Sequence, residues 1–189
     1  MGQSAKDAST LCIKCGLCCL GTLFSHVQVH PNEVQQVKEL GLTLRERGKD
    51  TVFDLACSAF KDGCCSVYKS RPKQCVTYIC KLNKDVMNAT CSLSEGLDIV
   101  QEVKKYTDQV LSALSPKENP DLRTHNYRLL LIEHHKNSLQ KLAQGTLTAR
   151  EEEVICIIFE QMKLIDRFFD STLLLNRYGE LIQSFPERP

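Results

Sequence analysis

The chain has 189 residues, of which 42% are hydrophobic and 25% are charged, and its formal net charge is +1. A chain of this length can bury a sizeable core, and its near-neutral charge argues against a general nucleic-acid binder. The longest apolar run has six residues, whereas a membrane-spanning helix needs about 18 or more. We therefore expect a globular protein that binds neither nucleic acid nor membrane.

The cysteines gather in one half of the chain. Ten of the eleven precede residue 92, and no apolar leader for export stands before them. The expected compartment is therefore the reducing cytoplasm, where dense cysteines favour metal binding over disulfides. Residues 1–91 carry 12 Lys and Arg against 8 Asp and Glu, while residues 92–189 carry 12 against 15. Metal-bound thiolates would offset the positive surplus of the first half.

The first half of the chain predicts short and irregular elements. Residues 1–11 resemble a loose tail, and the apolar residues of 22–29 indicate a strand. Residues 31–41 predict a short helix, because Pro31 suits a first helical turn and Gly41 suits a helix end.

Two further local signals follow. Thr43 and Glu46 have capping-box spacing, which predicts another short helical turn at 43–49. A helix starting at Pro72 would place Cys75 in its first turn. The helix dipole there would lower the pKa of the thiol and favour the thiolate that a metal binds.

The second half predicts three helices, at about 95–114, 121–144 and 149–183, separated by a break at 115–121 and by Gly145. Capping-box pairs precede the first and the third of them. The third helix is apolar over a wide arc, so it should be buried on most sides or pack on a partner. The capping pairs are Ser92 with Glu95 and Thr148 with Glu151, and the apolar arc comprises Val154, Ile155, Ile157, Ile158, Met162, Ile165, Phe168, Phe169 and Leu173.

Together these signals predict a mainly α protein with little β. Residues 1–91 should form an irregular, cysteine-rich metal-binding module, and residues 92–189 should form a three-helix segment packed on it.

The first cysteine run, CIKCGLCC at 12–19, has a spacing that is typical of metal sites. Cys12, Cys15 and Cys18 form C-x2-C-x2-C, which zinc ribbons use in pairs and bacterial ferredoxins use as a triple. The ferredoxin continuation C-x3-C-P does not follow, so the spacing alone does not choose between zinc and an iron–sulfur cluster.

Two cysteine pairs indicate more than one metal centre. Cys18 and Cys19 are neighbours, and adjacent side chains of an extended backbone point to opposite faces. Either they serve two centres, or they bridge one polynuclear centre, or one of them is a bystander. Cys75 and Cys80 would lie about 140° apart around a continuous helix. These two require two centres or a broken helix.

The same residues resemble the CxxCxxCC cysteine-cluster family, the YkgJ-like zinc- or iron-chelating proteins. That family's pattern is C-x2-C-x2-C-C, a single Cys, then C-x-[IV]-Y-x2-R-P-x2-C and a nearby last Cys. Here Val67, Tyr68, Arg71 and Pro72 match the second block. The resemblance covers roughly residues 12–80 and implies eight metal ligands. They are Cys12, Cys15, Cys18, Cys19, Cys57, Cys65, Cys75 and Cys80.

The resemblance has limits of its own. Cys64 is not required by the pattern, and it is either spare or an alternative ligand. Flagellin lysine N-methylases contain a similar cluster, thought to hold an iron–sulfur centre, but they are much longer than this chain. Their activity is therefore not carried over to it.

Residues outside the eight cysteines are expected to play other parts. Cys156 should be a small buried residue within an apolar helix, and Cys91 a bystander. His26 and His30 lie near the first run but are not favoured as ligands. His134 and His135 are expected on a solvated helix face, and Tyr68 in packing. Arg71 should offset the charge of the cluster or donate hydrogen bonds to sulfur.

The sequence thus predicts a metal-binding protein. An iron–sulfur cluster, most simply [4Fe–4S], is the first choice and zinc is a close second. The protein would be a redox or protein-modification accessory. Alternatives are a zinc-stabilised module that binds a partner protein through its C-terminal helices, or a metal chaperone or sensor. No catalytic triad, P-loop or dinucleotide motif is visible, so the sequence assigns no catalytic residue and does not decide whether the chain is an enzyme.

Overall fold

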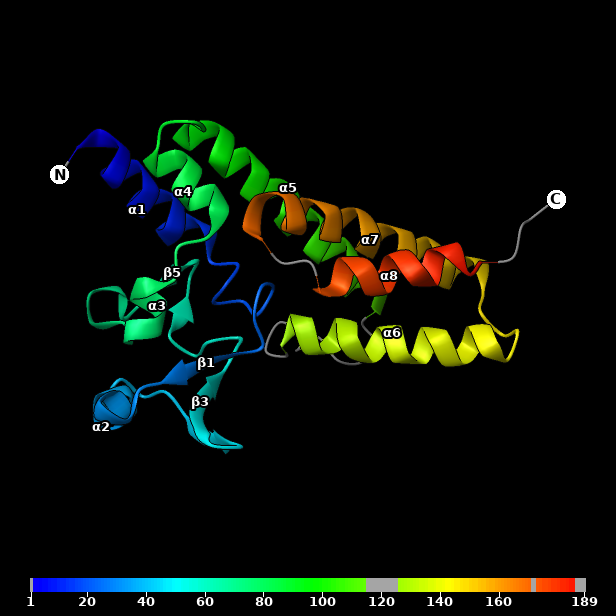
Figure 1. Ribbon diagram of the computed structural model, residues 1–189, viewed down its shortest axis with the longest axis horizontal. Coiled ribbons are helices and arrows are strands. Elements are labelled where there is room, and N and C mark those ends of the chain that lie inside the picture. Colours follow the sequence, from blue (N-terminus) through cyan, green and yellow to red (C-terminus); the bar gives the residue numbers. More distant parts are fainter. Residues whose placement is uncertain (1, 115–125, 171–172, 186–189) are drawn as a thin grey trace.

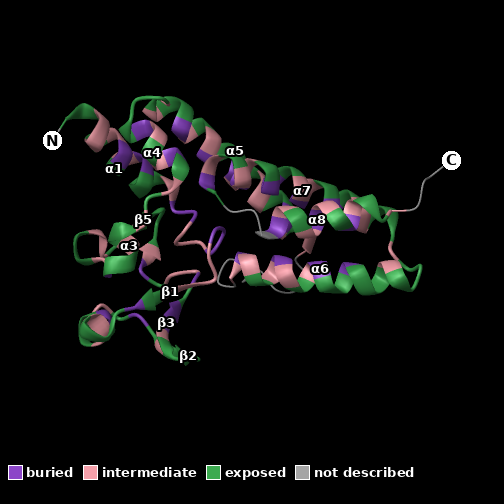
Figure 2. Ribbon diagram, in the orientation of Figure 1, coloured by how far each residue is buried: buried purple, intermediate pink, exposed green. Residues whose placement is uncertain are grey.

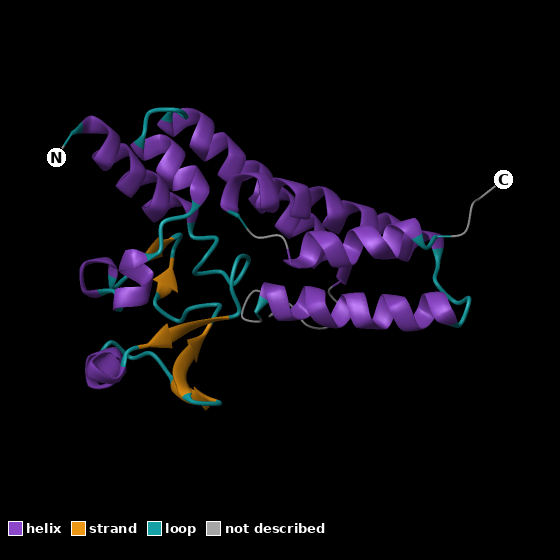
Figure 3. Ribbon diagram, viewed as in Figure 1, coloured by secondary structure: helices purple, strands orange, loops and turns teal. Residues whose placement is uncertain are grey.

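The computed structural model describes residues 2–114, 126–170 and 173–185. Helices make up most of this part, and its strands are short (Figures 1 and 3). The expectation of a mainly α fold with little β is confirmed. The expected break at 115–121 lies outside the described residues.

The N-terminal segment is a helix, α1 (Gln3–Cys15), so the prediction of a loose tail over residues 1–11 is wrong. Its buried face, which includes Ala8 and Leu11, packs against α4 and α5. The helix ends at Gly16, whose φ is 67°. A Cβ at this position would also clash with the ring of Phe60, so glycine is required there on both grounds.

The next segment forms a small antiparallel sheet in the order β1–β3–β2. Its strands are β1 (His26–Val29), β2 (Leu44–Arg47) and β3 (Asp50–Asp54). The helical turn predicted at 43–49 is therefore wrong. Strands β2 and β3 pair as a hairpin with a two-residue loop, and Gly48 supplies the positive φ that such loops need.

The elements around the sheet are short. The strand expected over 22–29 is limited to β1, whereas the helix expected over 31–41 is confirmed and ends before Gly41. A separate small core lies under the sheet and includes Val29, Val37 and Phe53. The other elements of this region are the 3-10 helix η1 (Pro31–Glu33), α2 (Val34–Glu39), β4 (Phe60–Lys61), β5 (Cys64–Cys65), the 3-10 helix η2 (Tyr68–Ser70), α3 (Lys73–Thr77) and α4 (Lys81–Met87).

The C-terminal half contains four described helices rather than three. They are α5 (Leu93–Leu114), α6 (Tyr127–Ala143), α7 (Ala149–Phe169) and α8 (Leu173–Gln183). The single helix predicted over 149–183 is wrong, because Asp170 adopts a left-handed conformation with φ 54° and ends α7. Both predicted capping boxes are present, at Ser92 with Glu95 and at Thr148 with Glu151.

One large hydrophobic core joins the two halves of the chain (Figure 2). Leu11, Leu17 and Leu82 from the cysteine-rich half pack in the same cluster as the helices of the C-terminal half. Helix α7 supplies the centre of this core, as its wide apolar arc predicts. Its fully buried apolar side chains are Ile155, Ile158, Met162, Ile165 and Phe169.

His134 and His135 do not lie on a solvated face, so that prediction is wrong. Both rings pack against Tyr178 of α8. His135 is buried and bonds the carbonyl of Arg177, while His134 Nδ1 lies 3.0 Å from the Tyr178 hydroxyl. Because that hydroxyl donates to Leu131 O, the imidazole of His134 must act as the donor to Tyr178.

Acid should therefore weaken the helical half through His134. Burial lowers the pKa of His134 from 6.5 to about 4. As the pH falls, His134 takes up a proton in the unfolded chain before it does so in the folded chain. His134 therefore adds stability above pH 6.5 that is lost as the pH falls towards 4. Its neighbours Glu151, His135 and Lys141 do not reverse this sign. The free energy of unfolding, measured at pH 7 and pH 5, should fall less on acidification in His134→Gln than in the wild type. An equal fall in both would contradict the assignment.

No helix in the described part of the chain is both long and apolar enough to cross a membrane.

Candidate metal centre

Six of the eight predicted cysteines line one cavity of about 290 Å³. It opens among α1, α3 and α4, and Phe169 of α7 also contributes to its wall. Helix α1 carries Cys12 and Cys15, and the turn after Gly16 carries the next two thiols. The six are Cys12, Cys15, Cys18, Cys19, Cys75 and Cys80.

Four of these thiols form a first set: Cys12, Cys15, Cys18 and Cys80. Every pair within the set interacts electrostatically. Since such interactions weaken with distance, the four side chains share one neighbourhood, although within the described residues they do not converge on a common metal position. Asn83 Nδ2 fixes α4 against α1 by donating to Ala8 O at 2.7 Å, which brings the start of α4 beside the other three thiols.

Cys19, Cys57, Cys65 and Cys75 form a second set, and again every pair interacts. The amide of Cys57 donates to Cys19 O at 2.7 Å, which holds these two segments together. Cys65 is placed by the short β4–β5 pairing opposite Phe60, whose ring covers Gly16. The second set therefore depends on the close approach at Gly16.

Two cysteine pairs whose spacing does not suit one metal ion, Cys18 with Cys19 and Cys75 with Cys80, are each divided between the two sets. Cys18 and Cys19 lie in a turn and interact with each other, but the other partners of Cys18 are in the first set, whereas most partners of Cys19 are in the second. Cys75 and Cys80 also fall in different sets, and the helix between them is broken. Helix α3 ends at Thr77, Tyr78 is extended, and Cys80 is the N-cap of α4.

Burial is the main cause of the shifts in the pKa values of the buried thiols. It raises the pKa of Cys15, Cys19 and Cys75 to about 12, and it raises the pKa of Cys18, Cys57 and Cys80 as well. The expectation that the start of a helix would lower the pKa of Cys75 is therefore wrong. Burial outweighs any helical effect there, and the neighbouring thiols add to it. A thiol of this kind becomes a thiolate when a cation displaces its proton.

Arg71 lies in the cavity wall beside the second set. Its guanidinium stacks over the Tyr68 ring at 3.7 Å, and its Nε donates to Tyr68 O at 3.0 Å. The guanidinium opposes the rise in the pKa of Cys75 that burial and nearby thiols cause. Tyr68 therefore has a packing role, as predicted, and it holds a cation near a thiol.

The C-terminal half also contributes to the site, which the sequence did not indicate. Lys104 of α5 donates to Lys14 O at 3.0 Å. Its positive charge also lies near Cys15 and partly offsets the rise in the pKa of that thiol that burial causes. Lys81 donates to Arg167 O at 2.7 Å and so joins α4 to the end of α7. A lysine on a helix surface gives no sequence signal that it reaches a distant backbone carbonyl.

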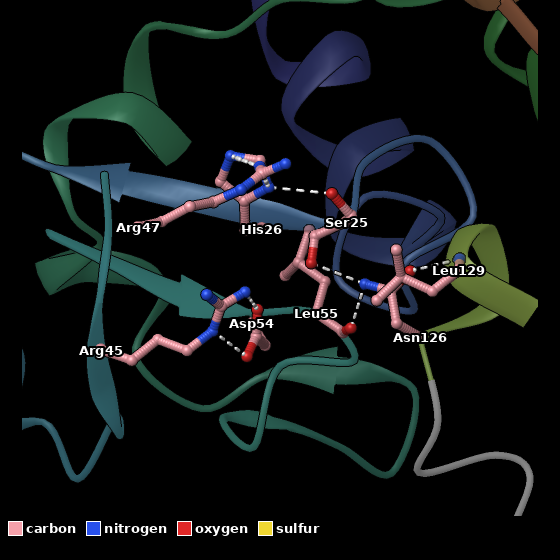
Figure 4. A network of polar contacts seen from close by, with 8 residues as sticks. All are labelled: Ser25, His26, Arg45, Arg47, Asp54, Leu55, Asn126 and Leu129. Carbon is pink, nitrogen blue, oxygen red and sulfur yellow. Dashed lines mark hydrogen bonds and ion pairs between the residues drawn. The ribbon is translucent and has the colours of Figure 1, made fainter. Parts of the chain in front are cut away.

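Asn126 joins helix α6 to two cysteine-bearing loops (Figure 4). Its side-chain oxygen caps α6 by accepting from Leu129 N at 3.0 Å. Its side-chain nitrogen donates to Ser25 O at 2.6 Å and to Leu55 O. Arg128 adds a bond from its Nη1 to Leu23 O at 2.9 Å. The loops that follow Cys19 and precede Cys57 are therefore held by one helix end.

The remaining candidates lie apart from the two sets. Cys64 is exposed, and its thiol faces Lys61 O. Cys91 interacts with Glu95 and Asp85 and donates to Ser92 O, in keeping with a bystander. His26 contacts Ser25 and Arg47, and His30 is exposed.

Cys156 is exposed on α7, so the prediction that it is buried is wrong. It lies on the outer face of the helix, between buried Ile155 and half-buried Ile157. Cys156→Ala should therefore change the free energy of unfolding by less than about 0.5 kcal/mol, as surface substitutions usually do. Metal content should not change. Denaturant titration and metal analysis would check both, and a loss of metal would show that this helix face reaches the site.

Within the described part of the chain, no three His, Cys, Asp or Glu side chains converge tightly enough to hold one metal ion. Residues 11–92 match the family model CxxCxxCC, described as a "putative zinc- or iron-chelating domain". The chain carries a CxxCxxCC domain. This domain runs from Leu11 in α1 to Ser92, the residue before α5, and it contains all eight predicted ligands. No curated protein and no solved structure matched the chain.

The family match supports a metal-binding, cysteine-cluster domain of a kind described as chelating zinc or iron. It covers fewer than half of the 189 residues, so it says nothing about helices α5 to α8 beyond their contacts with the domain.

Proposed function

We propose that the CxxCxxCC domain holds two metal centres, each bound by four thiolates. Cys12, Cys15, Cys18 and Cys80 would form the first, and Cys19, Cys57, Cys65 and Cys75 the second. The observation that supports it most is that the electrostatic partners of Cys18 include Cys15, Cys80 and Cys12, whereas those of Cys19 include Cys57, Cys65 and Cys75. Four thiolates are a complete ligand set for a structural zinc ion and also for a [4Fe–4S] cluster.

Within this proposal the first centre is a [4Fe–4S] cluster. Ferredoxins with two clusters use a C-x2-C-x2-C triple for one cluster and send the next Cys of the run to the other cluster. Cys12, Cys15 and Cys18 have this spacing, Cys80 completes their set, and Cys19 joins the second set. The division of the thiols therefore follows the ferredoxin arrangement although the C-x3-C-P continuation is absent.

The cavity agrees with a cluster in volume and lining. All four thiols of the first set face the same space of about 290 Å³, whose other walls include Leu11, Leu17 and Phe169. An apolar wall limits solvent access to a cluster, which is one of the factors that set its reduction potential. Arg71 and Lys104 supply positive charge near Cys75 and Cys15, which offsets the charge of bound thiolates.

A redox-active cluster would suit an accessory in electron transfer or protein modification, and this is the role that we propose. When bound, the cluster would supply one-electron chemistry. The chain's own residues would hold it, shield it and set the surrounding charge through Arg71 and Lys104. Arg71 would donate hydrogen bonds to sulfur or offset charge beside the second centre.

Anaerobic purification followed by metal and sulfide analysis tests this proposal. A brown protein with broad visible absorption, iron and acid-labile sulfide is the expected result. Two zinc ions per chain in a colourless protein would refute the cluster and support a zinc-stabilised module instead, while keeping the two centres. One metal ion per chain would refute the two centres themselves.

A further inference from the structure

Helix α3, which carries Cys75 of the second set, has no cap of its own. It contains only five residues, and its N-cap is Pro72, whose side chain makes no capping hydrogen bond. No acidic residue lies in its first turn. A helix of this length is not stable by itself in water. The position of Cys75 therefore depends on contacts between α3 and other parts of the chain.

Glu33 supplies the contact that the local sequence of α3 lacks. Its Oε1 accepts a hydrogen bond from the backbone amide of Lys73 at 2.7 Å, although the two residues are 40 positions apart in the chain. Glu33 ends η1, the element that follows β1, and α3 packs beside β1 (Figure 1). A carboxylate at the start of a helix binds an amide that has no partner within the helix, and it complements the positive end of the helix dipole.

The second carboxylate oxygen of Glu33 is buried without a partner. Among the described residues, Glu33 Oε2 and Thr22 Oγ1 are buried side-chain oxygens that have no hydrogen-bond partner. Burying such an oxygen without a partner lowers the free energy of unfolding. General stability therefore does not explain a carboxylate at this position, whereas its bond to the start of α3 does.

The two sets of thiols pack against different cores. Cys57 and Cys75 of the second set pack against the small core under the sheet. Cys15, Cys18 and Cys80 of the first set pack against the large core that joins the two halves of the chain. A contact between the sheet region and α3 should therefore affect the second set and leave the first set in place.

We propose that Glu33 is a positioning residue for the second metal centre, because by holding the start of α3 it keeps Cys75 beside the other three thiols of its set. The inference rests on the two centres of the proposed function. Glu33 is not among the described residues that line the thiol-lined cavity, so it acts through the helix rather than as a ligand.

Alkylation of each cysteine, followed by mass spectrometry of the peptides, tests this role. The metal-loaded protein is mixed with a chelator and N-ethylmaleimide, so that a thiol reacts once its metal has left. In Glu33→Ala the thiols of the second set should react about tenfold faster than in the wild type, because a hydrogen bond to a charged group is lost. The thiols of the first set should react at the wild-type rate.

Lys73→Pro removes the same hydrogen bond from the donor side. Proline has no amide proton and is tolerated in the first turn of a helix. This variant should reproduce the selective effect on the second set, and it serves if Glu33→Ala does not fold.

Two control variants separate positioning from a general loss of stability. Glu33→Gln keeps an oxygen that can accept from Lys73 N, so its alkylation rates should be closer to the wild type than to Glu33→Ala. Glu39→Ala removes a carboxylate of α2 that is bonded by Gln35 rather than by α3, so it should leave all rates unchanged.

Three results would overturn the role of Glu33. They are equal acceleration of both sets in Glu33→Ala, no acceleration of the second set in either Glu33→Ala or Lys73→Pro, and equal rates in Glu33→Gln and Glu33→Ala. Metal analysis of each starting preparation keeps this proposal distinct from the proposed function. One metal ion per chain would refute the two centres, whereas unchanged alkylation of Cys75 would refute the role of Glu33.

Discussion

Cys18→Ala and Cys19→Ala are expected to remove different metal centres although the two residues are adjacent. The strongest electrostatic partners of Cys18 are Cys15 and Cys80, whereas those of Cys19 are Cys57, Cys65 and Cys75, although each also interacts with one thiol of the other set. Each variant should lose the metal of its own set and keep that of the other. Metal and sulfide analysis, with electron paramagnetic resonance of the reduced protein, would show two complementary spectra that sum to that of the wild type.

The structural consequences should be complementary as well. Binding of structural zinc contributes on the order of 10 kcal/mol to small metal-dependent modules, and a four-thiolate centre should act on these loops in the same way. Cys18→Ala should therefore expose the region around α1 and α4 to limited proteolysis, and Cys19→Ala the region around β4, β5 and α3. Cys64→Ala is the matched control, because Cys64 neighbours Cys65 but its exposed thiol faces Lys61 O. Loss of all metal in both variants would instead indicate one coupled centre.

Local sequence signals predicted the secondary structure correctly where a single local interaction determines where an element begins. The capping boxes at Ser92 and Thr148 fixed two helix starts, because each is complete within four residues. The same kind of signal gave a wrong prediction where pairing between distant strands determines the secondary structure. Thr43 and Glu46 have the same spacing, but their segment is a strand held by its partner β3. Helix α7 ends at Asp170, which adopts a left-handed conformation, and the apolar periodicity of the sequence does not indicate this end.

The eight candidate ligands follow from spacing and resemblance and stay a prediction, and their division into two sets was one of several alternatives that the sequence left open. The adjacency of Cys18 and Cys19 left two centres, one bridged centre or a bystander open, and the partners of each thiol depend on the fold. Cys80 reaches the first set through the contact of α4 with α1, and Cys65 reaches the second through Phe60 on Gly16. The burial of His134 and the exposure of Cys156 also depend on helix packing, which a single-helix pattern does not contain.

The second large effect is expected at Asn126, because one side chain caps α6 and also bonds two cysteine-bearing loops (Figure 4). Loss of the cap costs about 1 kcal/mol, and loss of the donor to Leu55 O costs about 1–3 kcal/mol more, whereas Ser25 O keeps a bond from Leu55 N. Asn126→Ala should therefore lower the free energy of unfolding by about 2–4 kcal/mol. It should also speed metal transfer to a chelator, since the loops next to Cys19 and Cys57 lose a support.

Two matched variants separate the cap from the loop contacts. Asn126→Asp keeps an oxygen that can accept from Leu129 N but loses the donor to Ser25 O and Leu55 O. It should release metal as fast as Asn126→Ala. Thr148→Ala removes only the cap of α7, so it should cost about 1 kcal/mol and leave metal release unchanged. If Thr148→Ala speeds metal release as much as the Asn126 variants do, general loss of stability is the cause. If neither Asn126 variant speeds it, the end of α6 does not support the metal centres, and its contacts serve only to attach that helix.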